Sequence, residues 1–172
     1  MFMYEKNEAQ KERLEKILKR VKVLYGEVPP QMELLGNIEV EYLEDFFKMV
    51  MRVVKHPNIN SDFFGFIRLH IAFIEDYSYC KMYNTKFLFA KGYSQEELNA
   101  VIADVKALPL DNKHQALAYH AVRAIYESNE VIRADFEKLY VMGWSQKDVF
   151  DAIEHAGTLL RNGRILTTYS EK

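Results

Sequence analysis

Hydrophobic residues recur at intervals of three and four along most of the chain, with lysine and glutamate between them. This spacing places apolar side chains on one face of an α-helix, because a helix turns once in about 3.6 residues. It predicts an amphipathic N-terminal helix within residues 1–26, which Gly26 ends and which Pro29 and Pro30 prevent from resuming. The apolar stripe of this helix consists of Leu14, Ile17, Leu18, Val21, Leu24 and Tyr25.

The next helical segments differ in polarity. Residues 41–55 form a second amphipathic stretch. Asn60 or Ser61 is placed to cap the helix that follows, and residues 63–74 of that helix are apolar on nearly every face. A helix that is hydrophobic all round normally lies in the centre of a core or at an oligomer interface. We expect one of these two positions for residues 63–74.

The second half of the chain continues in the same helical pattern. A helix over residues 77–91 is expected to stop at Gly92, and a turn with a proline at 108–111 separates two further helices. No stretch alternates strictly between apolar and polar residues, so no β-strand is predicted. The pattern therefore predicts an all-α bundle of about seven to eight helices.

One short motif occurs twice. Residues 92–98 read Gly-Tyr-Ser-Gln-Glu-Glu-Leu, and residues 143–149 read Gly-Trp-Ser-Gln-Lys-Asp-Val. In each copy glycine ends one helix and serine caps the next, with an acid three residues later, Glu97 or Asp148, to complete a capping box. Two ordinary helix–glycine–helix turns would give the same signs, but the identities favour an internal helical-hairpin repeat. Its copies cover residues around 77–107 and 130–162.

Composition and charge narrow the class of protein. The 172 residues include 23 basic and 25 acidic side chains, for a formal charge of −2, and 49% of the residues are hydrophobic. The length fits a single domain over residues 1–172 with a sizeable core. The nearly balanced charge argues against nucleic acid or an acidic membrane surface as the main partner. Neither a membrane span nor a signal peptide is predicted, so we expect a cytoplasmic protein.

The chain contains a single cysteine, Cys80. One cysteine excludes an intrachain disulfide and any metal motif that needs several cysteines. The histidines have no metal-binding spacing either, since His114 and His120 are six residues apart and do not share a helix face. We therefore expect neither a metal ion nor another cofactor.

Three consecutive segments carry a recognisable pattern. They read Ile-Arg-Leu-His-Ile-Ala from residue 67, Tyr-Ser-Tyr-Cys-Lys-Met-Tyr-Asn from residue 77, and Gly-Tyr-Ser-Gln-Glu-Glu from residue 92. A buried helix, a cysteine-bearing helix and a glycine with a Ser-x-x-Glu cap follow one another in this way, which resembles the alkylhydroperoxidase D-like (AhpD-like) or carboxymuconolactone decarboxylase superfamily. Upstream, Val-Pro-Pro from residue 28 and Glu-Leu-Leu-Gly from residue 33 are similar to the N-terminal arm of its larger members.

The resemblance covers about residues 25–166 and implies an AhpD-like helical fold. Members of this superfamily assemble as homo-oligomers, so the resemblance also implies a dimer, trimer or hexamer. Its peroxidases use two cysteines, a histidine and a glutamate: one cysteine attacks peroxide, the other resolves the sulfenic acid to a disulfide, and the remaining two groups move protons.

Carried onto this sequence, most of those peroxidase positions have lost their chemistry. The first cysteine falls on Tyr77, the second on Cys80, the histidine on Asn84 and the glutamate near Gly65. Tyrosine forms no disulfide, glycine has no side chain, and an asparagine amide is not a base near pH 7. The resemblance therefore implies that a two-cysteine cycle is impossible within one chain. The acid–base residues of the decarboxylase-type members are not supplied at the matching places either.

The residues left at this place are Tyr77, Cys80 and Asn84. They lie at positions i, i+3 and i+7 of one helix and so share a face, which makes them the candidate catalytic residues. Cys80 is near the start of that helix, where the helix dipole favours a thiolate. Two interpretations stay open: Cys80 is a small core side chain, or it is the nucleophile of a one-cysteine peroxidase that an external thiol reductant recycles.

A remodelled binding pocket is the other candidate feature. It would lie beside the candidate catalytic residues, with His70, Phe66 and Phe73 of the 63–74 helix in its wall, although a lone histidine on an apolar face is more often a core residue. Glu154 or His155 is placed to line a pocket between the two halves of the chain. Two functions therefore remain: binding of a small molecule without two-cysteine peroxidase activity, or one-cysteine thiol peroxidase activity.

Overall fold

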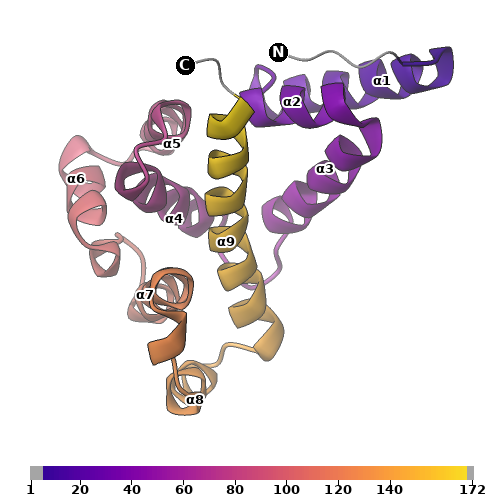
Figure 1. The fold of residues 1–172 in the computed structure, drawn as a ribbon. Helices are drawn as coiled ribbons and strands as arrows, with labels where there is room; N and C mark the ends of the chain where they lie inside the picture. The colour runs from indigo at the N-terminus through magenta and orange to yellow at the C-terminus, as the bar shows by residue number, and fades with distance from the viewer. Residues whose placement is uncertain (1–5, 170–172) are drawn as a thin grey trace. The chain divides into compact units, whose positions relative to one another are not determined.

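A computed structural model describes residues 6–169 of the chain, and every regular element in this part is helical (Figure 1). The prediction of an all-α fold is confirmed. The described part contains nine α-helices, one or two more than the pattern predicted, and two short 3₁₀ turns. The helices are α1 (Glu8–Tyr25), α2 (Pro30–Ile38), α3 (Val40–Val54), α4 (Ser61–Ile74), α5 (Ser78–Ala90), α6 (Gln95–Ala103), α7 (Asn112–Tyr126), α8 (Arg133–Val141) and α9 (Gln146–Tyr169).

Glycine and proline mark helix ends, but one helix start was not foreseen. Gly26, Gly92 and Gly143 all adopt positive φ, the left-handed conformation that lets glycine end a helix. Pro29 and Pro30 were expected only to prevent a helix. Instead Pro29 is the N-cap of α2 and Pro30 its first residue, where the missing N–H costs nothing because no intrahelical acceptor is available there.

Contacts divide the described chain into two compact units. The first comprises the chain through Val54 together with the end of α9 from Asn162, and the second comprises Lys55–Arg161. The expectation of a single domain stays a prediction. In the first unit Gly36 allows a close approach between helices, because a Cβ there would lie 2.7 Å from a methyl carbon of Leu14 and 2.9 Å from one of Leu43. The buried core of this unit consists of Ile17, Val21, Met32, Val40, Leu43 and Phe47.

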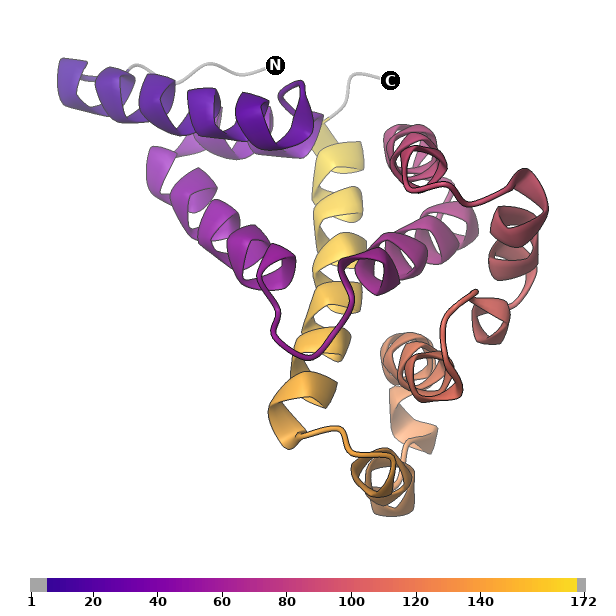
Figure 2. The same ribbon diagram turned by 180° about the vertical axis from the view of Figure 1, so that it is seen from behind.

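Helix α4 is the centre of the second unit. It packs against α5, α6 and α7, and the views from both sides show α5 beside it (Figures 1 and 2). This position agrees with the all-round apolar pattern of residues 63–74. The buried side chains and glycine of α4 are Phe63, Phe64, Gly65, Phe66, Ile67, Leu69, His70, Ile71 and Ala72.

Both copies of the repeated motif form the predicted capping boxes. The hydroxyl of Ser94 accepts the backbone N–H of Glu97 at 3.2 Å, and the carboxylate of Glu97 accepts the N–H of Ser94 at 2.7 Å. In the second copy the same pair of bonds joins Ser145 and Asp148, at 3.1 and 2.9 Å. Reciprocal bonds of this kind satisfy two N–H groups that a helix start otherwise leaves without partners.

No helix in residues 6–169 is both long and apolar enough to cross a lipid bilayer.

Candidate functional site

Arg68 connects three helices of the second unit through its guanidinium group. From α4, its Nε–H donates to Oδ1 of Asn84 on α5 at 2.8 Å, and its Nη1 lies 3.2 Å from Nε2 of His155 on α9. Asn84 in turn donates from Nδ2 to the backbone carbonyl of Cys80 at 2.8 Å. We call Arg68, Cys80, Asn84 and His155 the Arg68 cluster.

His155 is a neutral acceptor in this cluster. Its side chain is buried, and burial is the main cause that lowers its pKa well below the ordinary value, with the positive charge of Arg68 as a second cause. A guanidinium has only donors, so Nε2 of His155 must be the unprotonated nitrogen that accepts from Nη1. The ring is also held by an edge-to-face contact with Phe64, with the ring centroids 4.8 Å apart.

Cys80 is half-buried and is the third residue of α5. Burial raises the pKa of its thiol, and the charge of Arg68 opposes this only in part. The position near the helix start was expected to favour a thiolate. The loss of solvent around the sulfur acts in the opposite direction, and a pKa above the ordinary value leaves the thiol protonated at neutral pH.

The pH dependence of the alkylation rate of Cys80 reports the pKa of its thiol. We expect iodoacetamide to modify Cys80 more slowly at pH 7.5 than it modifies the cysteine of an unstructured peptide, and the rate to rise with a midpoint above that of the peptide. Arg68→Gln should move the midpoint further upward, since it removes the charge that favours the thiolate. Stopped-flow or mass-spectrometric rates over pH 7–11 check both statements. A midpoint at or below that of the peptide would contradict the assignment of a protonated thiol.

Tyr77 has a different environment from the other two candidate catalytic residues. It is the N-cap residue of α5, and its hydroxyl donates to the backbone carbonyl of Leu160 on α9 at 3.2 Å. The structure thus brings Cys80 and Asn84 together with Arg68, and it ties the Tyr77 hydroxyl to the backbone of α9. A catalytic role for Tyr77, Cys80 or Asn84 stays a prediction.

The three side chains assigned to a pocket wall lie in unlike surroundings. His70 is buried and donates from Nδ1 to the carbonyl of Val101 at 2.8 Å, as a core histidine does. Phe66 is fully buried against the edge of Tyr93, with the ring centroids 4.8 Å apart. Phe73 is 39% exposed, and Nζ of Lys81 lies 5.0 Å from its ring centroid. Their place in a pocket wall stays a prediction.

Gly65, near which the resemblance places the glutamate of the peroxidases, is closely packed against side chains of α5. A Cβ at this position would lie 2.8 Å from Cε1 of Phe87 and 3.2 Å from Cδ2 of Leu88, both on α5. The close packing of α4 on α5 therefore occupies the space that an acid would need.

The sequence analysis did not identify Arg68 as a site residue, and it gave His155 only as one of two candidates for a pocket wall. The signal was present, because Arg68 is the only charged residue in the apolar stretch 63–74. A charge in a helix with no polar face must find partners on its neighbours. Which neighbours these are could not be predicted, since His155 is 87 residues away in the chain.

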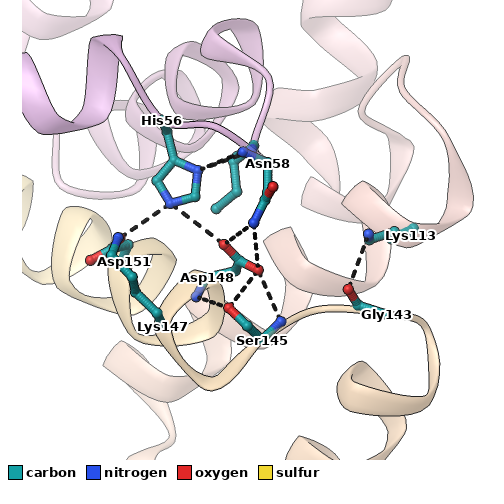
Figure 3. A network of polar contacts seen from close by, with 9 residues as sticks. His56, Asn58, Lys113, Gly143, Ser145, Lys147, Asp148 and Asp151 are labelled. Atoms are coloured by element: carbon teal, nitrogen blue, oxygen red, sulfur yellow. Dashed lines mark hydrogen bonds and ion pairs between the residues drawn. The ribbon is translucent and has the colours of Figure 1, made fainter.

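A second polar network joins the loop after α3 to the start of α9 (Figure 3). The side chain of His56 is 1% exposed; Nδ1 accepts the backbone N–H groups of Asn58 and Ile59 at 3.3 and 3.0 Å, so the ring proton lies on Nε2. That nitrogen lies 3.1 Å from Oδ2 of Asp151 and 3.7 Å from Oδ1 of Asp148. Both carboxylates are buried.

The two carboxylates of this network also bond to other side chains. The side chain of Asn58 donates to both oxygens of Asp148 at 3.1 and 3.3 Å, and Lys147 pairs with Asp151. Among the described residues no group of three or more histidine, cysteine, aspartate or glutamate side chains is arranged to hold a metal ion.

Comparison with solved structures identifies the fold. The chain matches an uncharacterized peroxidase-related protein from Silicibacter sp. TM1040 with a TM-score of 0.77 and 18% identity, over 91% of this chain and 82% of that one. It also matches the alkylhydroperoxidase AhpD core of an uncharacterized peroxidase-related protein from Ralstonia eutropha JMP134 with a TM-score of 0.70 and 16% identity, over 96% and 88% of the two chains.

These matches show that the chain has the AhpD-like fold, which confirms the fold that the resemblance implied. At such low identities the likeness is one of fold. No family model matches the sequence, and no curated protein matches it.

Proposed function

We propose that this AhpD-fold protein has no two-cysteine peroxidase cycle and binds a small organic molecule at the Arg68 cluster. The loss of the cycle is supported by the single cysteine and by the packing around Gly65, which has no room for an acid. The observation that carries the binding proposal is the pair of bonds from Arg68 to Asn84 and His155, which fixes a guanidinium at the place where the superfamily has its reactive groups.

The charge of the cluster indicates the class of ligand. Arg68 is positively charged, whereas the amide of Asn84, the neutral imidazole of His155 and the protonated thiol of Cys80 carry no charge. These four side chains together therefore carry one positive charge. A guanidinium recognises a carboxylate through two parallel hydrogen bonds, and aromatic side chains around it favour a flat apolar body. Phe87 is one such neighbour, with its ring centroid 5.7 Å from Cζ of Arg68. We propose an aromatic carboxylate as ligand.

Calorimetric titration with substituted benzoates tests this proposal. We expect saturable binding of at least one carboxylate and at least tenfold weaker binding of the matching amide or lactone, because only the carboxylate pairs with Arg68. Arg68→Lys should weaken binding about tenfold or more, since a lysine cannot keep the planar group that bonds to Asn84 and His155 and faces the ligand. Cys80→Ser should leave the affinity nearly unchanged.

Arg133→Gln is the matched control for the loss of one arginine. Its side chain is 92% exposed on α8 and makes a surface ion pair with Glu137. Equal loss of affinity in Arg133→Gln and in Arg68→Lys would contradict a specific role for Arg68. Equal binding of carboxylate and amide would contradict the proposed recognition of an anion.

One-cysteine peroxidase activity is the second candidate, and the effect of Arg68 on the Cys80 thiol is the observation that favours it. In this reaction the Cys80 thiolate attacks the terminal oxygen of a hydroperoxide: the S–O bond forms as the O–O bond breaks, and the alkoxide that leaves takes up the proton that the Cys80 thiol released. One external thiol then condenses with the sulfenic acid to a mixed disulfide and water, and a second external thiol reduces that disulfide. Intact mass with a dimedone trap distinguishes the two candidates. A rapid adduct that Cys80→Ser abolishes would establish the peroxidase, and no adduct at millimolar peroxide would exclude it.

We also propose that the chain forms a homo-oligomer, as the resemblance implies. Several large apolar side chains are exposed on the second unit, among them Ile132 at 60%, Val141 at 88% and Phe150 at 63%. Contact between copies is a common reason for such exposure. Light scattering coupled to gel filtration measures the number of subunits, and a monomer at micromolar concentration would contradict this proposal.

A further inference from the structure

A groove with an apolar floor and a cationic rim lies between α1 and α3 of the first unit. It encloses about 460 Å³, a volume within the range of small-molecule sites. Its floor is formed by Ile17 of α1 with Phe47 and Met51 of α3. Ile17 and Phe47 are members of the core of this unit, so the floor is part of a well-packed interior and is not a mobile surface.

The cations along the rim are not equally neutralised. At one end Arg13 binds Glu44 through Nε and Nη2, at 3.2 and 2.6 Å. Lys48 pairs with Asp45 at 2.8 Å. These two cations therefore have carboxylate partners.

Lys16 and Arg20 are the cations that remain. Within residues 6–169 Lys16 makes no hydrogen bond or ion pair, and the guanidinium of Arg20 lies over the ring of Phe47, 5.0 Å from its centroid, with no carboxylate bound to it. Two positive charges thus stand beside an apolar floor. This arrangement attracts a molecule that has an anionic head and an apolar body.

We propose that this groove binds a medium-chain alkyl carboxylate, with the carboxylate between Lys16 and Arg20 and the alkyl chain along Ile17, Phe47 and Met51. The lining residues of α1 extend from Arg13 to Arg20, about 10 Å along the helix axis, which suits a medium-length chain. This proposal is independent of the Arg68 cluster, because it uses residues of the first unit only.

Titration of the full-length protein with hexanoate, octanoate and decanoate, each below its micellar concentration, tests the proposal. We expect the affinity to increase with each added methylene by up to about fourfold, the factor that corresponds to complete burial of one methylene. Decanol and decyltrimethylammonium should bind at least tenfold more weakly than decanoate. The ε-methyl NMR signal of Met51, assigned with Met51→Leu, should shift on binding.

Charge reversal identifies the cations that take part. Lys16→Glu and Arg20→Glu should each weaken the binding of decanoate tenfold or more, and both positions are exposed, so the fold should tolerate them. Lys19→Glu is the matched control: it makes the same change on an exposed residue of the same helix turn that does not line the groove.

Four results would overturn the proposal. These are no saturable binding of decanoate at millimolar concentration, equal binding of decanol, equal weakening by Lys19→Glu and Lys16→Glu, and loss of decanoate binding in Arg68→Lys with none in Lys16→Glu. The last result would assign decanoate to the Arg68 cluster. If no benzoate binds but decanoate binds with the expected dependence on Lys16 and Arg20, the proposed ligand site at the Arg68 cluster is wrong and the proposed site in the groove is supported.

Discussion

Replacing His56 by alanine is expected to lower the free energy of unfolding by about 3–5 kcal/mol. The imidazole is almost fully buried, and its Nδ1 is the acceptor for two backbone N–H groups of the loop that leads into α4. Its Nε2–H donates to Asp151, whose side chain is 8% exposed. Alanine would leave two N–H groups without this acceptor and a buried carboxylate without this donor. Urea unfolding followed by circular dichroism measures the change.

Two variants of similar size test separately the bonds that Nδ1 accepts and the bond that Nε2–H donates. In His56→Asn the side-chain oxygen takes the place of Nδ1 and can still accept from Asn58 and Ile59. In His56→Gln the side-chain nitrogen can reach the place of Nε2 and donate to Asp151. We expect each variant to be less destabilised than His56→Ala. A value within 1 kcal/mol of the wild type for His56→Ala would contradict the assignment of this network as a structural connection.

Introducing glutamate at Gly65 is expected to destabilise the protein by about 3–5 kcal/mol, and not to restore peroxidase chemistry. Even a Cβ at this position would approach the ring of Phe87 to 2.8 Å, so that ring or the helix that carries it would have to shift. The carboxyl group would also enter a fully buried helix face. Thermal and urea unfolding measure the loss, and a peroxide-consumption assay measures any gain of activity.

Gly65→Ala and the double variant Gly65→Ala with Phe87→Leu are the controls. Gly65→Ala introduces the steric conflict without a buried carboxyl group and is expected to destabilise the protein by about 1–3 kcal/mol. The higher helix propensity of alanine offsets part of this loss. The smaller leucine should recover part of that loss, because it removes the nearest ring atoms. If Gly65→Glu is as stable as the wild type, the close approach of α4 and α5 is not as tight as the structure describes.

The local features of the helices could be predicted because their causes lie within a few residues. The glycine at the end of α1 and the serine–acid pairs at the starts of α6 and α9 act over three or four positions. The apolar face of α4 was evident from its own sequence. The helix after Pro29 was not predicted, because a proline can end one helix or begin the next. Which of the two occurs here depends on the packing of α2 against α3, which the local sequence does not reveal.

The chemistry of the candidate site was not predictable in the same way. Arg68 meets His155 across 87 positions of the chain, and His56 meets Asp151 across 95. The spacing that placed Tyr77, Cys80 and Asn84 on one helix face said nothing about these partners. Whether Cys80 is a protonated core thiol or a thiolate was left open by the sequence, because burial of the sulfur depends on the helices that cover it.

The sequence by itself determined the helices, most of their ends and the absence of a two-cysteine pair, since periodicity, caps and residue identity are local properties. The AhpD-like arrangement was implied by the resemblance to that superfamily and is shown by the matching solved structures. Only the tertiary structure decided that a guanidinium bonds to Asn84, one turn of helix from the single cysteine, that a buried histidine joins the α3–α4 loop to α9, and that side chains of α5 pack closely against Gly65. These outcomes depend on which side chains of distant helices come within about 3–4 Å of one another, where desolvation and hydrogen bonding set the charge of each group.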